Sequence, residues 1–171
     1  MNLYFKSKTL AEKAAWNYVE EHKDLELVVI NPYFIMGPSH SSGMGFSETW
    51  MKNWLDGTRE TVAKTQTSFV DVRDVALAHL KALEVPEANG KRFLLCGHDV
   101  WQEEVAKILI NKYPRYRGIP RKFEKGEYPK AGNDVDNTRS IEVLGIEYTP
   151  FEKTILDMAE SLHDRRIFEP K

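Results

Sequence analysis

The stretch LELVVI, residues 25–30, is rich in branched apolar residues and ends at the breakers Asn31 and Pro32. A short apolar run between breakers is typical of a strand buried on both faces, as in the parallel sheets of α/β proteins. A turn through Gly37 and Pro38 follows it. We therefore predict an α/β chain, with further strands near residues 68–70 and 92–96 and helices between the strands.

An amphipathic helix is predicted ahead of this strand, from Tyr4 through Val19. Its apolar positions recur at intervals of three and four residues, at Ala11, Ala14, Ala15, Tyr18 and Val19. Because this stripe consists mostly of alanine, the helix can approach a neighbouring sheet or helix closely. We expect it to pack tightly against a large element.

Tyr4 and Lys8 stand four residues apart at the start of that helix. Residues at this spacing share a helix face, so the ammonium can lie within a few Å of the phenol and favour its phenolate form. Such a tyrosine can act as a general acid or base. A Tyr–Lys pair at this spacing also arises by chance in roughly 30% of chains this long, so the pair alone assigns no function.

The later helices are predicted from their capping residues. Asp71 caps a helix over residues 72–83, with Asp74 at its third position, although the two acids could instead form a catalytic pair. Arg73, between them, could anchor a loop or approach a cofactor phosphate. Asp99 is predicted to open a helix that runs through Lys112.

One more helix is predicted from a capping box near the end of the chain. The box is TPFE, residues 149–152, with its proline at the first helical position, and the helix runs to about Leu162. These capped helices are expected to build the scaffold and not to carry the chemistry.

The composition bounds the choice of partners. The 24 Lys and Arg residues against 26 Asp and Glu residues give a net charge of −2, which favours neither nucleic acid nor a membrane surface. No apolar run approaches the roughly 18 residues of a membrane span, and no charged-then-apolar leader is recognisable. We expect a cytoplasmic protein with no nucleic-acid or membrane partner.

The single cysteine, Cys96, excludes an internal disulfide, and its setting FLLC predicts a buried thiol and not a nucleophile. No two histidines stand at the spacing of metal ligands, so no metal site is expected. The five are His22, His40, His79, His98 and His163. Three tryptophans, Trp16, Trp50 and Trp54, fall on predicted helices.

Several longer motifs follow one another at a specific spacing. They are YFKSKTLAEKAAW (residues 4–16), VVINPYFIMGP (28–38), FVDVRDVALAH (69–79), GKRFLL (90–95) and LGIEYTP (144–150). On these motifs the chain resembles the extended short-chain dehydrogenase/reductases, within the NAD-dependent epimerase/dehydratase superfamily. The branch it resembles holds dihydroflavonol reductases and cinnamoyl-CoA reductases, and the resemblance covers nearly the whole chain.

The resemblance implies an oxidoreductase that reduces a small-molecule carbonyl with NADP, or alternatively NAD, and without a metal. Tyr4 would protonate the carbonyl oxygen as hydride arrives, and Lys8 would activate Tyr4 and hydrogen-bond the nicotinamide ribose. Pro32 and Ile35 match the segment that meets the carboxamide, and Ser47 matches a position near the cofactor phosphates.

Three further residues are candidates for the substrate site. They are Tyr33, Trp50 and Trp54, although for the two tryptophans core packing is the favoured interpretation. Cinnamoyl-CoA reductases typically read NWYCYGK where this chain has NLYFKSK (residues 2–8), so an aldehyde or ketone competes with a coenzyme A thioester as substrate. Residues 112–130 carry seven basic against two acidic residues, which predicts a solvated loop or, alternatively, a site for coenzyme A or cofactor phosphates.

Members of this family begin with a strand, a glycine-rich turn and a helix that hold the cofactor pyrophosphate. The glycine-rich part of this chain, residues 37–45, lacks the GxGxxG spacing, and the family's catalytic Ser or Thr would lie upstream of Tyr4. We therefore expect the C-terminal half of a reductase: a partial, doubly wound Rossmann-like sheet with a small substrate lobe. Residues 1–36 and 66–112 would belong to the sheet, and residues 37–65 and 113–171 to the lobe.

Such a half would expose the edge of the strand over residues 25–31 and the alanine face of the first helix. Exposed apolar surface predicts a partner, here a separate N-terminal half or another protein. Three functions follow from this. The chain is expected to be a reductase completed by that half; the alternatives are an inactive assembly subunit and a binding module that works without cofactor.

Overall fold

The computed structural model describes residues 3–40, 43–130 and 135–168. In chain order its elements are α1 (Leu3–Glu21), β1 (Val29–Pro32), β2 (Phe34–Met36), α2 (Phe46–Leu55), β3 (Thr61–Val62), β4 (Gln66–Asp71), α3 (Val72–Glu84), a 3₁₀ turn (Pro86–Ala88), β5 (Arg92–Leu95), β6 (His98–Trp101), α4 (Gln102–Lys112), β7 (Lys122–Phe123), α5 (Thr138–Glu142) and α6 (Phe151–Asp164). The alternation of strands and helices confirms the α/β prediction.

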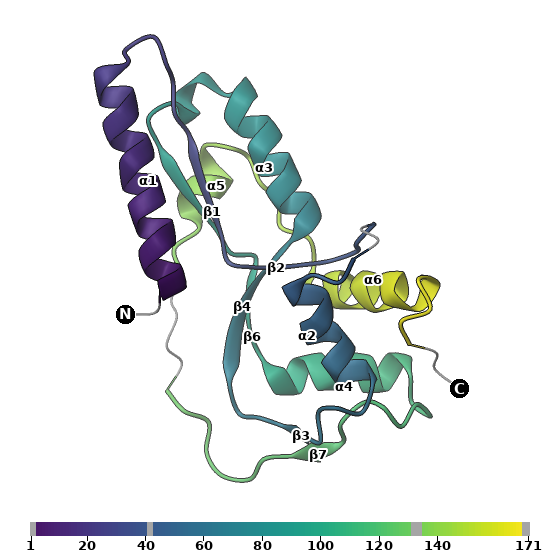
Figure 1. Ribbon diagram of the computed structural model, residues 1–171. Helices are drawn as coiled ribbons and strands as arrows, with labels where there is room; N and C mark the ends of the chain where they lie inside the picture. Colours follow the sequence, from purple (N-terminus) through teal and green to yellow (C-terminus); the bar gives the residue numbers. More distant parts are fainter. Residues whose placement is uncertain (1–2, 41–42, 131–134, 169–171) are drawn as a thin grey trace.

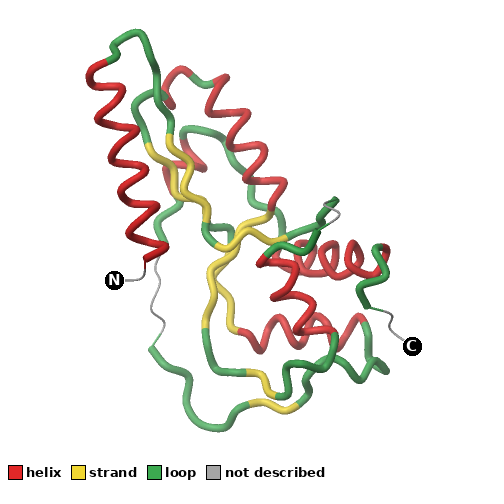
Figure 2. Tube along the Cα trace, viewed as in Figure 1, coloured by secondary structure: helices red, strands yellow, loops and turns green. Residues whose placement is uncertain are grey.

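The strands form three small sheets. β1 pairs with β5 in parallel, β4 lies between parallel β2 and antiparallel β6, and β3 pairs with β7 in parallel. In Figure 1, α1 and α3 stand on either side of the β1–β5 pair, and α2, α4 and α6 gather at the other end of the molecule. Figure 2 shows the strands as a twisted spine between these two groups of helices.

Two hydrophobic cores meet at β4. Successive side chains of a strand point to opposite faces, so Phe69 enters the core under α2, α4 and α6, while Val70 enters the core between α3 and β5. Phe93 and Leu95 of β5 are fully buried in this second core. β4 therefore fixes the position of the β1–β5 pair relative to the helices on its other side.

The first strand differs from its prediction. It begins at Val29 instead of Leu25, and its residues are half-buried or exposed and not buried on both faces. β5 covers one edge of β1, and within the described residues no strand pairs with the other edge. Burial on both faces would require neighbours that the described elements do not supply.

The first helix also differs from the expected tight packing. α1 has no buried residue, and Leu3, Phe5, Leu10 and Tyr18 are each more than 50% exposed. Of the alanine face that was predicted to be exposed, Ala11, Ala14 and Tyr18 are exposed, while Ala15 and Val19 are half-buried.

Two predicted caps are wrong. Asp99 lies in β6, and α4 begins three residues later, with Trp101 as its N-cap. Asp99 instead accepts a hydrogen bond from Ser68 on the neighbouring strand β4. Thr149 does not cap α6, because its hydroxyl donates to Asp74 at 2.7 Å and Pro150 takes the N-cap position.

The predicted start of α3 is confirmed, because Asp71 caps this helix by accepting a hydrogen bond from the backbone N–H of Arg73 at 2.8 Å. The three tryptophans Trp16, Trp50 and Trp54 lie on helices, as predicted. In the parts of the chain that the structure describes, no helix combines the length and the apolar character needed to cross a lipid bilayer.

Candidate active site

Tyr4 and Lys8 lie one turn apart near the start of α1. The Nζ atom of Lys8 is 5.7 Å from the centroid of the Tyr4 ring, so the two side chains share a face as the spacing predicted. The Tyr4 side chain is 60% exposed. A reacting group could therefore approach both the phenol and the ammonium from the same side.

Glu12, one further turn along this face, ties α1 to the sheet. Its carboxylate accepts hydrogen bonds from Nε of Arg92 at 2.8 Å and from the side-chain amide of Asn31 at 3.4 Å. The hydrogen bond from Arg92 lowers the pKa of Glu12 below its ordinary value. This contact sets the position of the Tyr4–Lys8 face relative to β1 and β5. It was not predicted, because 80 residues separate Glu12 from Arg92 in the sequence.

The direction of α1 carries Tyr4 to the end of the sheet where ligands usually bind. Tyr4 lies two turns, about 12 Å, before Glu12, and α1 runs against β1. Figure 1 shows the first turn of α1 near the end of β1. In open α/β sheets, ligands bind outside the carboxyl ends of parallel strands. Pro32 and Tyr33 stand at this end too, and both are exposed.

A cavity of about 380 Å³ lies between β2, the start of α2 and α6; we call it the α2–α6 cavity. Its wall includes Ile35 and Ser47, so the structure brings together two of the residues predicted to bind the cofactor. Tyr4, Lys8 and Pro32 are not among its lining residues. The predicted cofactor residues therefore fall into two groups, one at the end of β1 and one at this cavity.

The two tryptophans of α2 differ in their surroundings. Trp54 is fully buried in the core, as the favoured interpretation predicted, and the guanidinium of Arg59 lies 4.3 Å from the centroid of its ring. Trp50 is half-buried and packs against Phe34 and Phe69. Of the pair, only Trp50 offers surface to a ligand.

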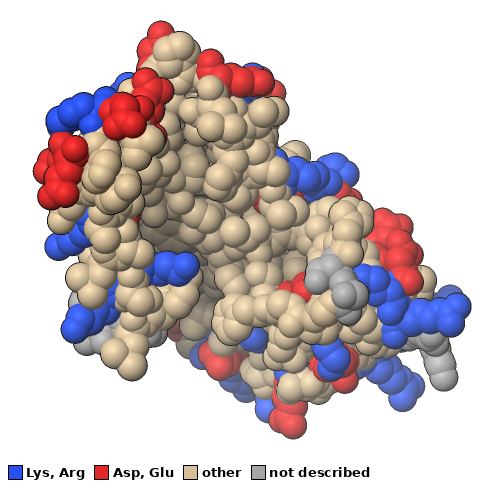
Figure 3. All heavy atoms as spheres, turned by 45° about the horizontal axis from the view of Figure 1, so that its top comes forward, with Lys and Arg blue, Asp and Glu red and all other residues tan. Residues whose placement is uncertain are grey.

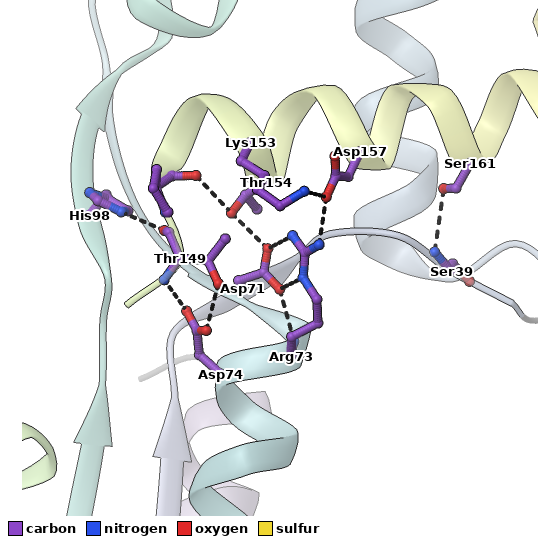
Figure 4. Close-up of polar contacts among 11 residues, drawn as sticks. Ser39, Asp71, Arg73, Asp74, His98, Thr149, Lys153, Thr154, Asp157 and Ser161 are labelled. Atoms are coloured by element: carbon purple, nitrogen blue, oxygen red, sulfur yellow. Dashed lines mark hydrogen bonds and ion pairs between the residues drawn. The ribbon is translucent and has the colours of Figure 1, made fainter. Parts of the chain in front are cut away.

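A polar network joins α3 to α6 (Figure 4). The guanidinium of Arg73 donates to both carboxylate oxygens of Asp71 and, at 2.5 Å, to Asp157 of α6. Asp71 also accepts from the hydroxyl of Thr154 at 2.7 Å. Asp71 and Arg73 thus anchor α6 to the start of α3.

Asp74 and His98 make a second connection to the start of α6. Asp74 accepts from both the backbone N–H and the hydroxyl of Thr149, and Nε2 of His98 lies 2.9 Å from the Thr149 carbonyl oxygen. The capping and packing interpretations therefore account for Asp74 and His98, and a catalytic pair of Asp71 and Asp74 is not needed.

Cys96 is buried, as predicted, and burial together with the charge of Asp99 raises the pKa of its thiol to about 11. Such a thiol is a poor nucleophile at neutral pH. Within the described ranges, no cluster of three or more His, Cys, Asp or Glu side chains could hold a metal ion.

Two contacts at the α2–α6 cavity were missed from the sequence. Glu48 of α2 is buried and pairs with Arg165, which directly follows α6. The position of Glu48 at the third residue of a helix was a signal for its contact with the backbone N–H of Gly45. Its contact with Arg165, 117 residues away, had no signal in the sequence.

Comparison with known proteins agrees with the fold. The chain is 34% identical over 169 residues to cinnamoyl-CoA reductase 1 of Arabidopsis thaliana, covering 99% of this chain and 48% of that protein. The crystal structure of yeast methylglyoxal/isovaleraldehyde reductase with NADPH matches with a TM-score of 0.81 at 29% identity, over 96% of this chain and 52% of the yeast chain.

Vestitone reductase from alfalfa shares the fold with a TM-score of 0.75 at 23% identity, over 96% of this chain and 53% of that chain. The chain thus spans about half the length of the relatives that it matches. Residues 1–96 match the NAD dependent epimerase/dehydratase family, and this stretch contains the Tyr4–Lys8 helix, the α2–α6 cavity wall at Ile35 and Ser47, and strands β1 to β5. The chain therefore belongs to the NAD dependent epimerase/dehydratase family.

Proposed function

We propose that this chain is the catalytic-helix half of an NAD(P)H-dependent reductase that converts a carbonyl to an alcohol or aldehyde. The observation that carries the proposal is the Tyr4–Lys8 face of α1, a helix that the Glu12–Arg92 ion pair holds against the parallel β1–β5 pair. In this proposal the hydroxyl of Tyr4 donates a proton to the carbonyl oxygen. The charge of Lys8 favours the phenolate that remains.

A bound NAD(P)H would supply the hydride that the carbonyl carbon accepts. The residues present fit one part of such a cofactor. Pro32 is exposed at the end of β1, and Ile35 and Ser47 line a cavity whose wall also includes Gly37 and Gly45. The sequence has no GxGxxG turn for the pyrophosphate.

We infer that a strand–turn–helix unit, in the same or a second polypeptide, supplies the pyrophosphate site. The open edge of β1 and the exposed apolar residues of α1 offer it a surface. Figure 3 shows this region as a hollow face of mostly uncharged atoms beside α1, with charged side chains at its rim. NADPH is the preferred cofactor in this proposal, since the yeast relative was solved with NADPH.

The substrate class is a small aldehyde or ketone in this proposal. The names of the relatives give three test substrates: methylglyoxal, isovaleraldehyde and cinnamoyl-CoA. The half-buried Trp50 and the exposed Tyr33 are the side chains proposed to contact the substrate. Residues 112–130 remain a candidate for the phosphates of coenzyme A, because most of this segment is exposed.

The experiment is a titration of NADPH followed by an assay of NADPH consumption with these three carbonyls. It is run on the chain alone and on a fusion of the chain to the half of the yeast reductase that the chain does not match; we call this protein the fusion. We expect NADPH binding and carbonyl reduction by the fusion, with weaker or no turnover by the chain alone. A folded fusion that binds NADPH and reduces no carbonyl would contradict the proposal.

A second candidate function is an assembly subunit without catalysis. The observation in its favour is the same exposed surface on α1, which a partner could cover without any cofactor. An inactive subunit would bind its partner equally well when Tyr4 or Lys8 is replaced, whereas a reductase would lose turnover.

A further inference from the structure

Glu48 is a buried carboxylate at the point where three parts of the chain meet. It accepts hydrogen bonds from the backbone N–H of Gly45, from Nη1 of Arg165 and from the side chain of Ser39. Only 6% of Glu48 is exposed, whereas isolated buried carboxylates are strongly destabilising. The ionised side chain is therefore held by these partners and in turn holds them together.

Arg165 binds Glu48 and also the backbone that precedes Gly45. Its Nη2 donates to the carbonyl oxygen of Gly43 at 2.7 Å while its Nη1 binds Glu48. The planar fork of one guanidinium thus joins α2 and the backbone before it. The Arg165 side chain is 20% exposed, so water screens this ion pair less than it screens a surface pair.

Residues 37–40 and Gly45 form part of the wall of the α2–α6 cavity. Glu48 itself lines the cavity, as does Met158 of α6. Ser161 of α6 accepts a hydrogen bond from the backbone N–H of Ser39 at 3.3 Å, as Figure 4 shows. α6 therefore contacts the wall twice, through Ser161 and just beyond its end through Arg165.

The first half of α6 is also held in place. The Arg73–Asp157 and Asp71–Thr154 contacts hold α6 against the start of α3, where Val72 lines the same cavity. Met158 lies between these contacts and Ser161 along α6. The position of α6 therefore affects the cavity wall directly at Met158 and, through Ser161, at Ser39.

We propose that Glu48 and Arg165 are positioning residues for the ligand of the α2–α6 cavity, because together they hold the backbone at Ser39, Gly43 and Gly45 in place. This inference rests on the proposed function, in which Ile35 and Ser47 of this cavity meet the cofactor. A plain helix cap would need only the Glu48–Gly45 contact. Glu48 also accepts hydrogen bonds from Arg165 and Ser39, which capping the helix does not require.

The test is a double-mutant cycle with Glu48→Gln, Arg165→Gln and their combination in the 171-residue chain. The matched control is the same cycle on the exposed pair of Glu84 and Lys81 on α3, which changes the same charges away from the cavity. Exchange of the Gly45 amide proton is followed by NMR, with the Ala78 amide in the α3 core as the measure of global stability.

We expect the Gly45 amide to exchange about tenfold faster in each single variant than in the control, with no further acceleration in the double variant. The Ala78 amide should change no more than it does in the control variants. Arg165→Lys, which keeps the charge and loses the fork, should give an intermediate rate. Equal acceleration at Gly45 and Ala78, or additive effects of the two single changes, would overturn the proposal.

A second readout is the affinity for NADPH, measured by fluorescence titration in the fusion. Arg165→Gln is expected to raise the Kd for NADPH about tenfold, with partial recovery in Arg165→Lys. An unchanged Kd would contradict a role in positioning this ligand. If the unmodified fusion binds no NADPH, the proposed function fails, while the exchange experiment still decides whether Arg165 acts through Glu48.

Discussion

Lys8 is the residue whose role depends most directly on its place in α1. Its ammonium lies on the same face of α1 as Tyr4. Lys13 of this helix is also exposed but lies on a different face. If Lys8 favours the Tyr4 phenolate, Lys8→Met should lower kcat of the fusion at least about tenfold, and Lys13→Met should leave it unchanged. Steady-state kinetics with NADPH and an aldehyde measure both. Equal kcat values for the two variants would contradict the role.

The thiol of Cys96 gives a second test at this scale. Since burial and the nearby Asp99 raise its pKa to about 11, the native protein should react with iodoacetamide at least about a hundredfold more slowly than the urea-unfolded chain. Mass spectrometry of the alkylated fraction over time measures the rates. A native rate equal to that of the unfolded chain would show that the thiol is accessible and ionises normally.

At the residue scale, prediction from the sequence worked where the partners are close in sequence. The Tyr4–Lys8 face and the Asp71 cap follow from spacings of two to four residues, and the structure contains both. The Arg92–Glu12 and Arg165–Glu48 contacts span 80 and 117 residues, so only the fold brings them together. Thr149 was misassigned for the same reason, because its partner Asp74 lies 75 residues earlier.

Among the elements, α6 is held to the start of α3 by several polar contacts. The side chain of Asp71 is fully buried. It accepts hydrogen bonds from the Thr154 hydroxyl and from the backbone N–H of Arg73 at the start of α3, and it forms an ion pair with the Arg73 guanidinium. Asp71→Asn should therefore lower the free energy of unfolding by about 2–3 kcal/mol, since it leaves Arg73 and Thr154 imperfectly paired. Urea unfolding measures the loss. The control is Glu84→Gln at the other end of α3, the helix that Asp71 caps. It should change the free energy of unfolding by about 0.5 kcal/mol or less.

The pH dependence of this contact has a defined sign. Burial alone would raise the pKa of Asp71, but the hydrogen bonds from Arg73 and Thr154 outweigh it, so the pKa lies below its ordinary value of 3.8. The stabilisation is therefore complete above that value and is lost as the pH falls through the lower, folded-state pKa. The difference in unfolding free energy between the native chain and Asp71→Asn should be constant near neutral pH and shrink in acid. A difference that grows as the pH falls would contradict this sign.

Elements were predicted well where local pattern and tertiary surroundings agree. α1, α3 and β5 have apolar periodicity or clear caps, and each was predicted within a few residues. β2 and β6 are three and four residues long, too short for a pattern of their own, and their pairing with β4 is what makes them strands. β1 is shorter than its apolar run, because only one partner strand pairs with it among the described residues.

For the whole molecule, the notable property is the contrast between its two halves. One hydrophobic core is enclosed by α2, α4 and α6, while the β1–β5 pair carries an open edge and a helix without buried residues. The chain spans about half the length of its relatives. The Tyr4–Lys8 pair lies on the open side, so the proposed chemistry depends on what covers that side.

The most direct test of the proposed reductase is NADPH consumption by the fusion with an aldehyde, comparing Tyr4→Phe with the unmodified protein. Tyr18→Phe, a change of the same kind on an exposed tyrosine of α1, is the control. We predict that Tyr4→Phe lowers kcat at least about a hundredfold with little change in NADPH affinity, and that Tyr18→Phe has no effect. A Tyr4→Phe fusion that consumes NADPH at the unmodified rate would contradict the account.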